Sequence, residues 1–348
     1  MITVSVFTVL LLIILFSFFF ALSNGLHDAS SVVATIITSG AASPKGAVLL
    51  ASVFGMIGAL FGGSMVADTV SSIIDLPASS SLLPVLLSAV TGAVLWNMIT
   101  WKFGLPSSST HALVGGIVGA VLVSSGAGHV LWGLSELTAA GPQVRGIVKI
   151  VLSLLISPVI GFAAAWTLEK LAKILLRNAK FTINRRIKKL QWAIAAGLSL
   201  AHGANDTQKI LGLIVLALVS GGTAPLHSAP VWARLCLGAL MFLGTMLGGW
   251  KIMKTVGRGI FELEPIHSLS SQLASAGSIL AANFMGAPVS STHIVVGSVM
   301  GVGSAENYKM VNWNIVREIV LSWVITIPAS AAVSALLYLI ISRVLNLV

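Results

Sequence analysis

Pro106-Ser107-Ser108-Ser109-Thr110-His111 returns, almost unchanged, as Pro288-Val289-Ser290-Ser291-Thr292-His293, 182 residues further along the chain. A second string, Gly25-Leu26-His27-Asp28, returns as Gly203-Ala204-Asn205-Asp206 after 178 residues. The two strings keep their order and almost keep their spacing. The sequence therefore predicts two homologous halves, each with one carboxylate and one cluster of hydroxyl groups inside apolar sequence.

The sequence around these strings is that of a membrane protein. Hydrophobic residues make up 56% of the 348 residues, charged residues 9%, and the mean hydropathy is +1.00, whereas about 25% of a soluble domain is charged. Lipid forces backbone groups to pair within a segment, and the alternation of a transmembrane barrel is missing, so we expect an all-α polytopic membrane protein. The charge-free stretches that approach or exceed the roughly 20 residues of a membrane span are Gly46–Ala67, Leu76–Trp101, Leu235–Trp250 and Ile319–Ser342.

The N-terminal stretch Val4–Leu22 is expected to be a retained helix. No basic residue precedes it, and it is longer than the core of a secretory signal. Cys236 is the only cysteine, which excludes a disulfide or a thiolate metal site within one chain.

Basic residues are concentrated in the middle of the chain. The net charge is +10, and eight of the 20 basic residues lie between Lys170 and Lys189. The positive-inside rule explains this cluster as a short cytoplasmic segment, which can also contact anionic lipids, so no nucleic-acid partner is expected. The predicted organisation is a first transmembrane repeat (1–168), a basic cytoplasmic linker (169–190) and a second transmembrane repeat (191–348).

The orientation of the two halves depends on how often each crosses the membrane. An odd number of crossings gives an inverted repeat with both termini outside, the plan of many secondary transporters, and an even number gives parallel repeats. We expect the inverted repeat, in a multi-pass protein of the plasma membrane.

Each proline-serine string is expected to form the tip of a re-entrant helical hairpin. Leu82–Phe103 or Ser270–Met285 would enter the bilayer, and a helix starting at Ser108 or Ser290 would return. Such irregular backbone is tolerated only where it is buried in protein or lines a cavity. Gly25 and Gly203 predict similar breaks beside the two aspartates.

The helix starts at the two tips predict an anion site. Free N–H groups and capping hydroxyls at a helix N-terminus bind anions, and neutral donors suit a transporter that must also release its substrate. The simpler alternative is that the serines only cap their own helices. The expected ligands of a tetrahedral oxyanion are Ser108, Ser109, Thr110, Ser290, Ser291 and Thr292.

Asp28 and Asp206 are expected to bind both cations and the anion. An aspartate in mid-membrane costs about 2.5–3.5 kcal/mol on insertion scales and normally marks an ion or substrate pathway. Sodium prefers oxygen ligands, and further oxygens would come from Asn24, Asn205, Ser109 and Ser291. The alternative for Asp206 is an ion pair with a neighbour such as Lys209.

Other titratable residues point to no separate site. The spacing of the histidines is not specific for a metal, and the His-Glu-x-x-His arrangement of a hydrolase is absent. Glutamates near segment ends, among them Glu169 and Glu306, are expected to be solvated. We therefore expect that the protein is not an enzyme and uses no cofactor. The alternative function among enzymes is a metal-dependent hydrolase.

The quoted strings resemble those of the inorganic phosphate transporter (PiT) family, which shares a duplicated Gly-Ala-Asn-Asp signature and a Pro-x-Ser-Ser/Thr-Thr-His turn. The resemblance spans both halves. It implies symport of phosphate with sodium or protons through inverted repeats and re-entrant hairpins, with the signature aspartates and serines at the site.

Departures from the family pattern bear on the coupling ion. His27 replaces the first signature asparagine, and Gly55 and Gln272 stand where family members often carry a membrane glutamate. The missing acids favour sodium over protons and leave Gln208 and Gln272 as neutral ligands.

We therefore predict a sodium-coupled inorganic phosphate symporter; the alternatives are a proton-coupled phosphate or sulfate symporter and an anion channel. Phosphate carries a proton that a carboxylate can accept, whereas sulfate does not. The oligomeric state, including a homodimer, is left open.

Overall fold

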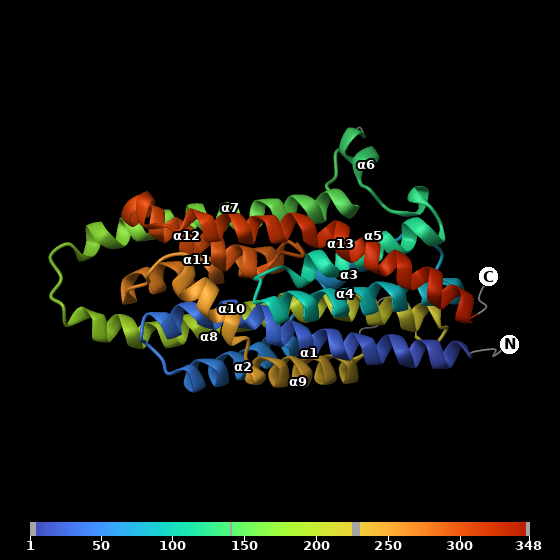
Figure 1. The fold of residues 1–348 in the computed structure, drawn as a ribbon, viewed down its shortest axis with the longest axis horizontal. Coiled ribbons are helices and arrows are strands. Elements are labelled where there is room, and N and C mark those ends of the chain that lie inside the picture. Colours follow the sequence, from blue (N-terminus) through green and yellow to red (C-terminus); the bar gives the residue numbers. More distant parts are fainter. Residues whose placement is uncertain (1–4, 140, 225–229, 346–348) are drawn as a thin grey trace.

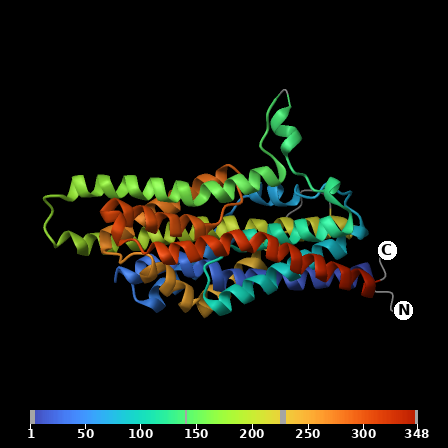
Figure 2. The ribbon, with the colours of Figure 1, turned by 45° about the horizontal axis from the view of Figure 1, so that its top comes forward.

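The chain folds into a bundle of helices that run along one long axis (Figures 1 and 2). The computed structural model describes residues 5–139, 141–224 and 230–345. Within these ranges the only β-pairing is an isolated bridge between Ile74 and Val130. Among the described helices, five are long and apolar enough to cross a membrane, or six if a bent pair counts as one span. The expectation of an all-α protein is confirmed.

The first half contains the helices up to the basic segment. They are α1 (Val6–Thr38), α2 (Pro44–Phe61), α3 (Met65–Ser71), η1 (Ser80–Leu82), α4 (Leu83–Phe103), α5 (Ser109–Ser124), η2 (Ala127–His129), α6 (Leu134–Thr138) and α7 (Gly146–Leu176).

The second half begins at α8. Its helices are α8 (Ile183–Ser220), α9 (Val231–Leu247), α10 (Trp250–Lys254), η3 (Thr255–Gly259), α11 (Pro265–Phe284), α12 (Ser291–Asn307), η4 (Tyr308–Met310) and α13 (Trp313–Leu345). The chain bends by 64° between α9 and the segment Trp250–Gly259.

The two halves interlock, because helices of one half pack on helices of the other. α2 contacts α8 as α9 contacts α1, and α5 contacts α13 as α12 contacts α7. α1 and α8 are antiparallel: Ser39, which follows α1, donates to Gln191 near the start of α8 (2.9 Å). Each cluster of buried apolar residues therefore contains residues of both halves.

Two helical hairpins place their tips inside the molecule. α4 and α5 form one hairpin and α11 and α12 the other, and they open toward opposite ends of the bundle (Figure 1). Gly104 and Gly286, at φ +70° and +58°, turn the chain after α4 and α11. The returning helices begin at Ser109 and Ser291, directly after the serines at which the sequence predicts their start.

The predicted breaks at Gly25 and Gly203 are wrong, because α1 and α8 are continuous through both strings. These glycines instead allow close helix crossings. A Cβ on Gly203 would overlap the carbonyl oxygen of Gly55, and one on Gly25 would lie 2.6 Å from that of Met241. The backbone carbonyl groups beside the two aspartates are therefore bonded within the helices.

Eight of the 20 basic residues lie on the ends of α7 and α8 and in residues 177–182, which join these helices. The two helix ends extend beyond the other helices (left in Figure 1). α1 begins and α13 ends at the opposite end of the bundle.

Candidate functional site

The two hairpin tips meet in the interior, where α1 and α8 carry the signature aspartates past them. Asp28 is 3% exposed and Asp206 is fully buried. Each carboxylate must find its partners inside the protein, because water cannot solvate it there. The predicted hydroxyl ligands are also buried: Ser108, Ser109, Thr110, Ser290, Ser291 and Thr292.

Asp28 accepts hydrogen bonds from both tips. Ser109 of the first tip donates to Oδ2, and Thr292 of the second donates to Oδ1 over 3.1 Å. Ser31, one helical turn after Asp28, has its Oγ 3.3 Å from Oγ1 of Thr292. One carboxylate thus links α1 to the hydroxyl clusters of both halves.

His27 connects Asp28 to the backbone of the first tip. Its Nδ1 lies 2.9 Å from Oδ1 of Asp28, and its Nε2 lies 3.1 Å from the carbonyl oxygen of Leu105. The hydroxyls of Thr100 and Ser107 are each 3.3 Å from Nε2. The imidazole that replaces the signature asparagine therefore orients the carboxylate and the turn together.

Asp206 is paired with Lys209, the arrangement that the sequence offers as the alternative to cation binding. The ammonium Nζ lies 2.7 Å from Oδ1, and Asn24 of α1 donates to Oδ2 over 3.1 Å. Nδ1 of His202 lies 3.4 Å from the same Oδ2 and 2.9 Å from Oγ of Ser291.

Lys209 reaches from α8 into the tips of both hairpins. Besides Asp206, its Nζ donates to Oγ1 of Thr110 and to the carbonyl oxygen of Val289, each over 2.6 Å. The side chain is 2% exposed. All three N–H donors of this buried ammonium have oxygen partners, which offsets much of the cost of burying its charge.

The remaining predicted ligands have other partners. Ser108 and Ser290 accept from the backbone N–H groups of His111 (3.2 Å) and His293 (3.3 Å), so both are N-caps, as the capping alternative expects. The amide of Asn205 donates to Asn283 (2.6 Å).

The two glutamine side chains are engaged away from the aspartates. Gln208 accepts from the N–H of Val66 (2.9 Å) and donates to the carbonyl of Ala204 (3.0 Å), which anchors α3 on α8. The amide of Gln272 lies 3.0 Å from Ser268 and 3.2 Å from Thr35.

Ser31 and His202 also belong to the cluster, although the sequence does not single them out as ligands. The available signal is helical spacing, because residues three or four positions from an aspartate share its face. Trp323 of α13 is also missed; its indole N–H donates to the carbonyl of Pro106 (2.9 Å) and its ring stacks on His293.

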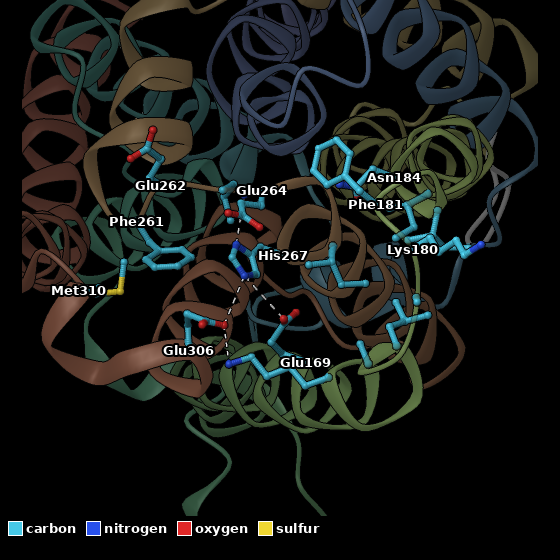
Figure 3. Close-up of a pocket in the computed structure, with 18 residues that line it drawn as sticks. Glu169, Lys180, Phe181, Asn184, Phe261, Glu262, Glu264, His267, Glu306 and Met310 are labelled. Atoms are coloured by element: carbon cyan, nitrogen blue, oxygen red, sulfur yellow. Dashed lines mark hydrogen bonds and ion pairs between the residues drawn. The ribbon is translucent and has the colours of Figure 1, made fainter.

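A second polar cluster lies near the basic end, in a cavity of about 730 Å³ (Figure 3). Nε2 of His267 is 3.7 Å from Glu169 and 3.5 Å from Glu306, and Lys173 lies 2.5 Å from Glu306. The Lys173 ammonium holds the pKa of the Glu306 carboxyl below its usual range. The expectation that Glu169 is solvated is wrong: its side chain is fully buried, because α11 and α12 pack over α7.

The chemistry of His267 argues against a metal in this cluster. Its Nδ1 accepts from the backbone N–H of Glu264 (3.1 Å), as part of the N-terminal cap of α11. A neutral imidazole that accepts at Nδ1 carries its proton on Nε2, the atom that faces the two carboxylates. Nε2 then carries a hydrogen and has no lone pair free to bind a metal.

The chain is similar to proteins of a known family along most of its length. Residues 24–334 match the model of the "Phosphate transporter family". A Rhizobium meliloti protein named "Probable low-affinity inorganic phosphate transporter" is 37% identical, with 95% of this chain and 96% of the relative covered. A Bacillus subtilis protein of the same name is 34% identical, with 96% and 97% covered.

A solved structure described as "The sodium-dependent phosphate transporter" shares the fold and superposes with a TM-score of 0.86. It is 26% identical in sequence, and the match covers 97% of this chain and all of that one.

Proposed function

This chain belongs to the phosphate transporter family, and we propose that it is a sodium-coupled symporter that brings inorganic phosphate across the plasma membrane. The observation that carries the proposal is the convergence of two hairpin tips and two buried aspartates on one interior point. The sodium-dependent name of the similar solved structure supports the choice of ion.

Phosphate would bind between the tips. The hydroxyls of Ser109, Thr110, Ser291 and Thr292 come from both halves and are uncharged donors, which hold an anion without trapping it. A protonated phosphate oxygen would donate to an aspartate, as sulfate would not. Ser108 and Ser290 would act through the helix starts that they cap.

Sodium would bind beside the anion and offset its charge. Asp28 offers carboxylate oxygens, and the hydroxyl oxygens of Ser31 and Thr292 lie next to it. Hard cations take such oxygen ligands. Asn24 adds an amide oxygen that lacks a hydrogen-bond partner among the described residues.

Alternating access would arise from an inverted repeat. The antiparallel course of α1 and α8, and the opposite directions of the two hairpins, support this arrangement. In a membrane the hairpins would be re-entrant, the basic ends of α7 and α8 would be cytoplasmic and next to anionic lipids, and both termini would be outside. The site would then be open first to one side of the membrane and then to the other.

The test is uptake of radiolabelled phosphate into proteoliposomes under a sodium gradient or a proton gradient, with excess sulfate as competitor. We expect sodium to drive uptake and sulfate to compete poorly. Asp28→Asn and Asp206→Asn should each lower the initial rate at least about tenfold, since each removes a charge from the site.

Other outcomes identify the alternatives. Uptake driven only by protons would reject sodium coupling, and equal competition by sulfate would reject phosphate selectivity. Uptake that follows the phosphate gradient alone would indicate an anion channel.

A further inference from the structure

We propose that Lys209 is a resident cation, which occupies in the second half of the site the position that a mobile sodium ion occupies in the first. The protein would then carry one sodium ion fewer per phosphate than a transporter with two equivalent half-sites. This inference rests on the proposed sodium-coupled transport.

The two halves of the site differ in charge three residues after the signature aspartate. Asp28 and Asp206 correspond, and so do Thr292 and Thr110 at the two tips. Three residues after the aspartate, the first half has Ser31 and the second has Lys209. A short hydroxyl side chain in one half is therefore matched by a long cationic side chain in the other.

The contacts of these residues follow the same correspondence. In the first half, Thr292 donates to Asp28 and lies 3.3 Å from Ser31. In the second half, Nζ of Lys209 lies between Asp206 (2.7 Å) and Thr110 (2.6 Å). The lysine nitrogen thus lies between aspartate and threonine in the second half, whereas in the first half the threonine hydroxyl bonds directly to the aspartate.

The partners of Lys209 are those that a sodium ion would take. A carboxylate, a hydroxyl and the carbonyl of Val289 surround Nζ. Oxygen ligands of these three kinds bind hard cations in proteins. A positive charge held there by a side chain cannot leave during transport.

The contacts of Nζ fit the ammonium form of the lysine. Thr110 donates its own hydroxyl proton to the carbonyl of Val289 (3.3 Å), so it must accept from Nζ. Carboxylate and carbonyl oxygens only accept. Three acceptors need three N–H groups, and a neutral amine has two.

Histidine does not account for the difference between the halves. His27 lies 2.9 Å from Asp28, and His202 lies 3.4 Å from Asp206. Each aspartate therefore has one imidazole next to it, and the lysine is the additional charge.

The decisive experiment counts sodium ions. Lys209→Ser gives the second half the residue that the first half has at position 31. We expect the purified variant to bind about one more ²²Na⁺ per chain than the unmodified protein. In proteoliposomes, the Hill coefficient for sodium activation of phosphate uptake should rise from about one toward two, because it is limited by the number of coupled sites.

Two control variants distinguish the loss of the positive charge at position 209 from the loss of a lysine side chain in general. Lys209→Arg keeps a positive charge and should leave the number of bound sodium ions unchanged. Lys149→Ser removes a lysine whose Nζ contacts Thr69, far from the aspartates in sequence, and should change neither measurement.

The reciprocal variant keeps the proposal testable if Lys209→Ser does not fold. Ser31→Lys places an ammonium in the first half and should abolish the sodium binding of the unmodified protein. Unchanged sodium binding in a folded Lys209→Ser or Ser31→Lys variant would overturn the role of Lys209. A protein that takes up no phosphate, or takes it up without sodium, instead rejects the proposed function, and the sodium count of Lys209→Ser still decides the inference.

Discussion

Lys209 and Glu169 are both buried, but they differ in the number of their hydrogen-bond partners. Lys209 has three oxygen partners within 2.7 Å. Glu169 is equally buried, yet neither of its carboxylate oxygens has a hydrogen-bond partner among the described residues. Its neighbour His267 is 3.7 Å away, beyond hydrogen-bond distance. A buried charge without such bonds destabilises the folded protein.

Replacing Glu169 should therefore stabilise the protein. Glu169→Gln keeps the size of the side chain and removes its charge, and we expect the free energy of unfolding to rise by about 1–3 kcal/mol. The readout is the thermal unfolding midpoint in detergent. The matched control is Glu306→Gln, which loses a partly exposed ion pair with Lys173 and should cost less than about 1 kcal/mol. A lower midpoint for Glu169→Gln would show that the charged form is the stabilising one.

Helix crossings depend on small residues placed where two backbones meet. Gly203 of α8 meets Gly55 of α2, and Gly58 of α2 meets Leu200 of α8. Without a hydrophobic driving force between helices in lipid, such close contacts are a main source of packing energy. Gly25 and Gly203 thus allow α1 and α8 to pack closely on α9 and α2. This packing determines where the two aspartates lie along the bundle.

Substitution of Gly203 tests this packing role. Gly203→Ala would drive its Cβ into the carbonyl oxygen of Gly55, so we expect a loss of about 1–3 kcal/mol in stability from overpacking. A Cβ added at Gly197 of the same helix would meet no described atom within 4 Å, and Gly197→Ala should be neutral or stabilise by up to about 1 kcal/mol. Thermal unfolding midpoints compare the two. Equal midpoints would contradict the packing role of Gly203.

The whole molecule is built so that neither half can form the site alone. Asp28 receives hydroxyls from both tips, and Lys209 of the second half reaches Thr110 of the first. α5 packs on α13 and α12 packs on α7, so each tip is supported by the last helix of the other half. A movement of one hairpin therefore changes the contacts of both aspartates.

The orientation of this assembly can be measured by cysteine labelling. In a Cys236→Ser background, Ala179→Cys lies between α7 and α8, and Ala127→Cys lies at the start of η2, directly after α5. α5 runs toward the end of the bundle opposite the α7–α8 connection (Figure 1). Both positions are exposed. We expect a membrane-impermeant maleimide to label Ala127→Cys in intact cells, and Ala179→Cys only in inside-out vesicles. Labelling of both from outside would reject the proposed topology.

The sequence by itself determined the membrane class and the starts of both returning helices. Both follow from local properties: apolar length, and serine caps after a proline turn. It did not determine that α1 and α8 continue past Gly25 and Gly203. The sequence does not distinguish a glycine that breaks a helix from one that allows two helices to cross closely. Only the tertiary structure decided the partners of each charge. Lys209 meets Thr110 across 99 residues and Glu169 is covered by the other half, and such burial depends on which helices pack together.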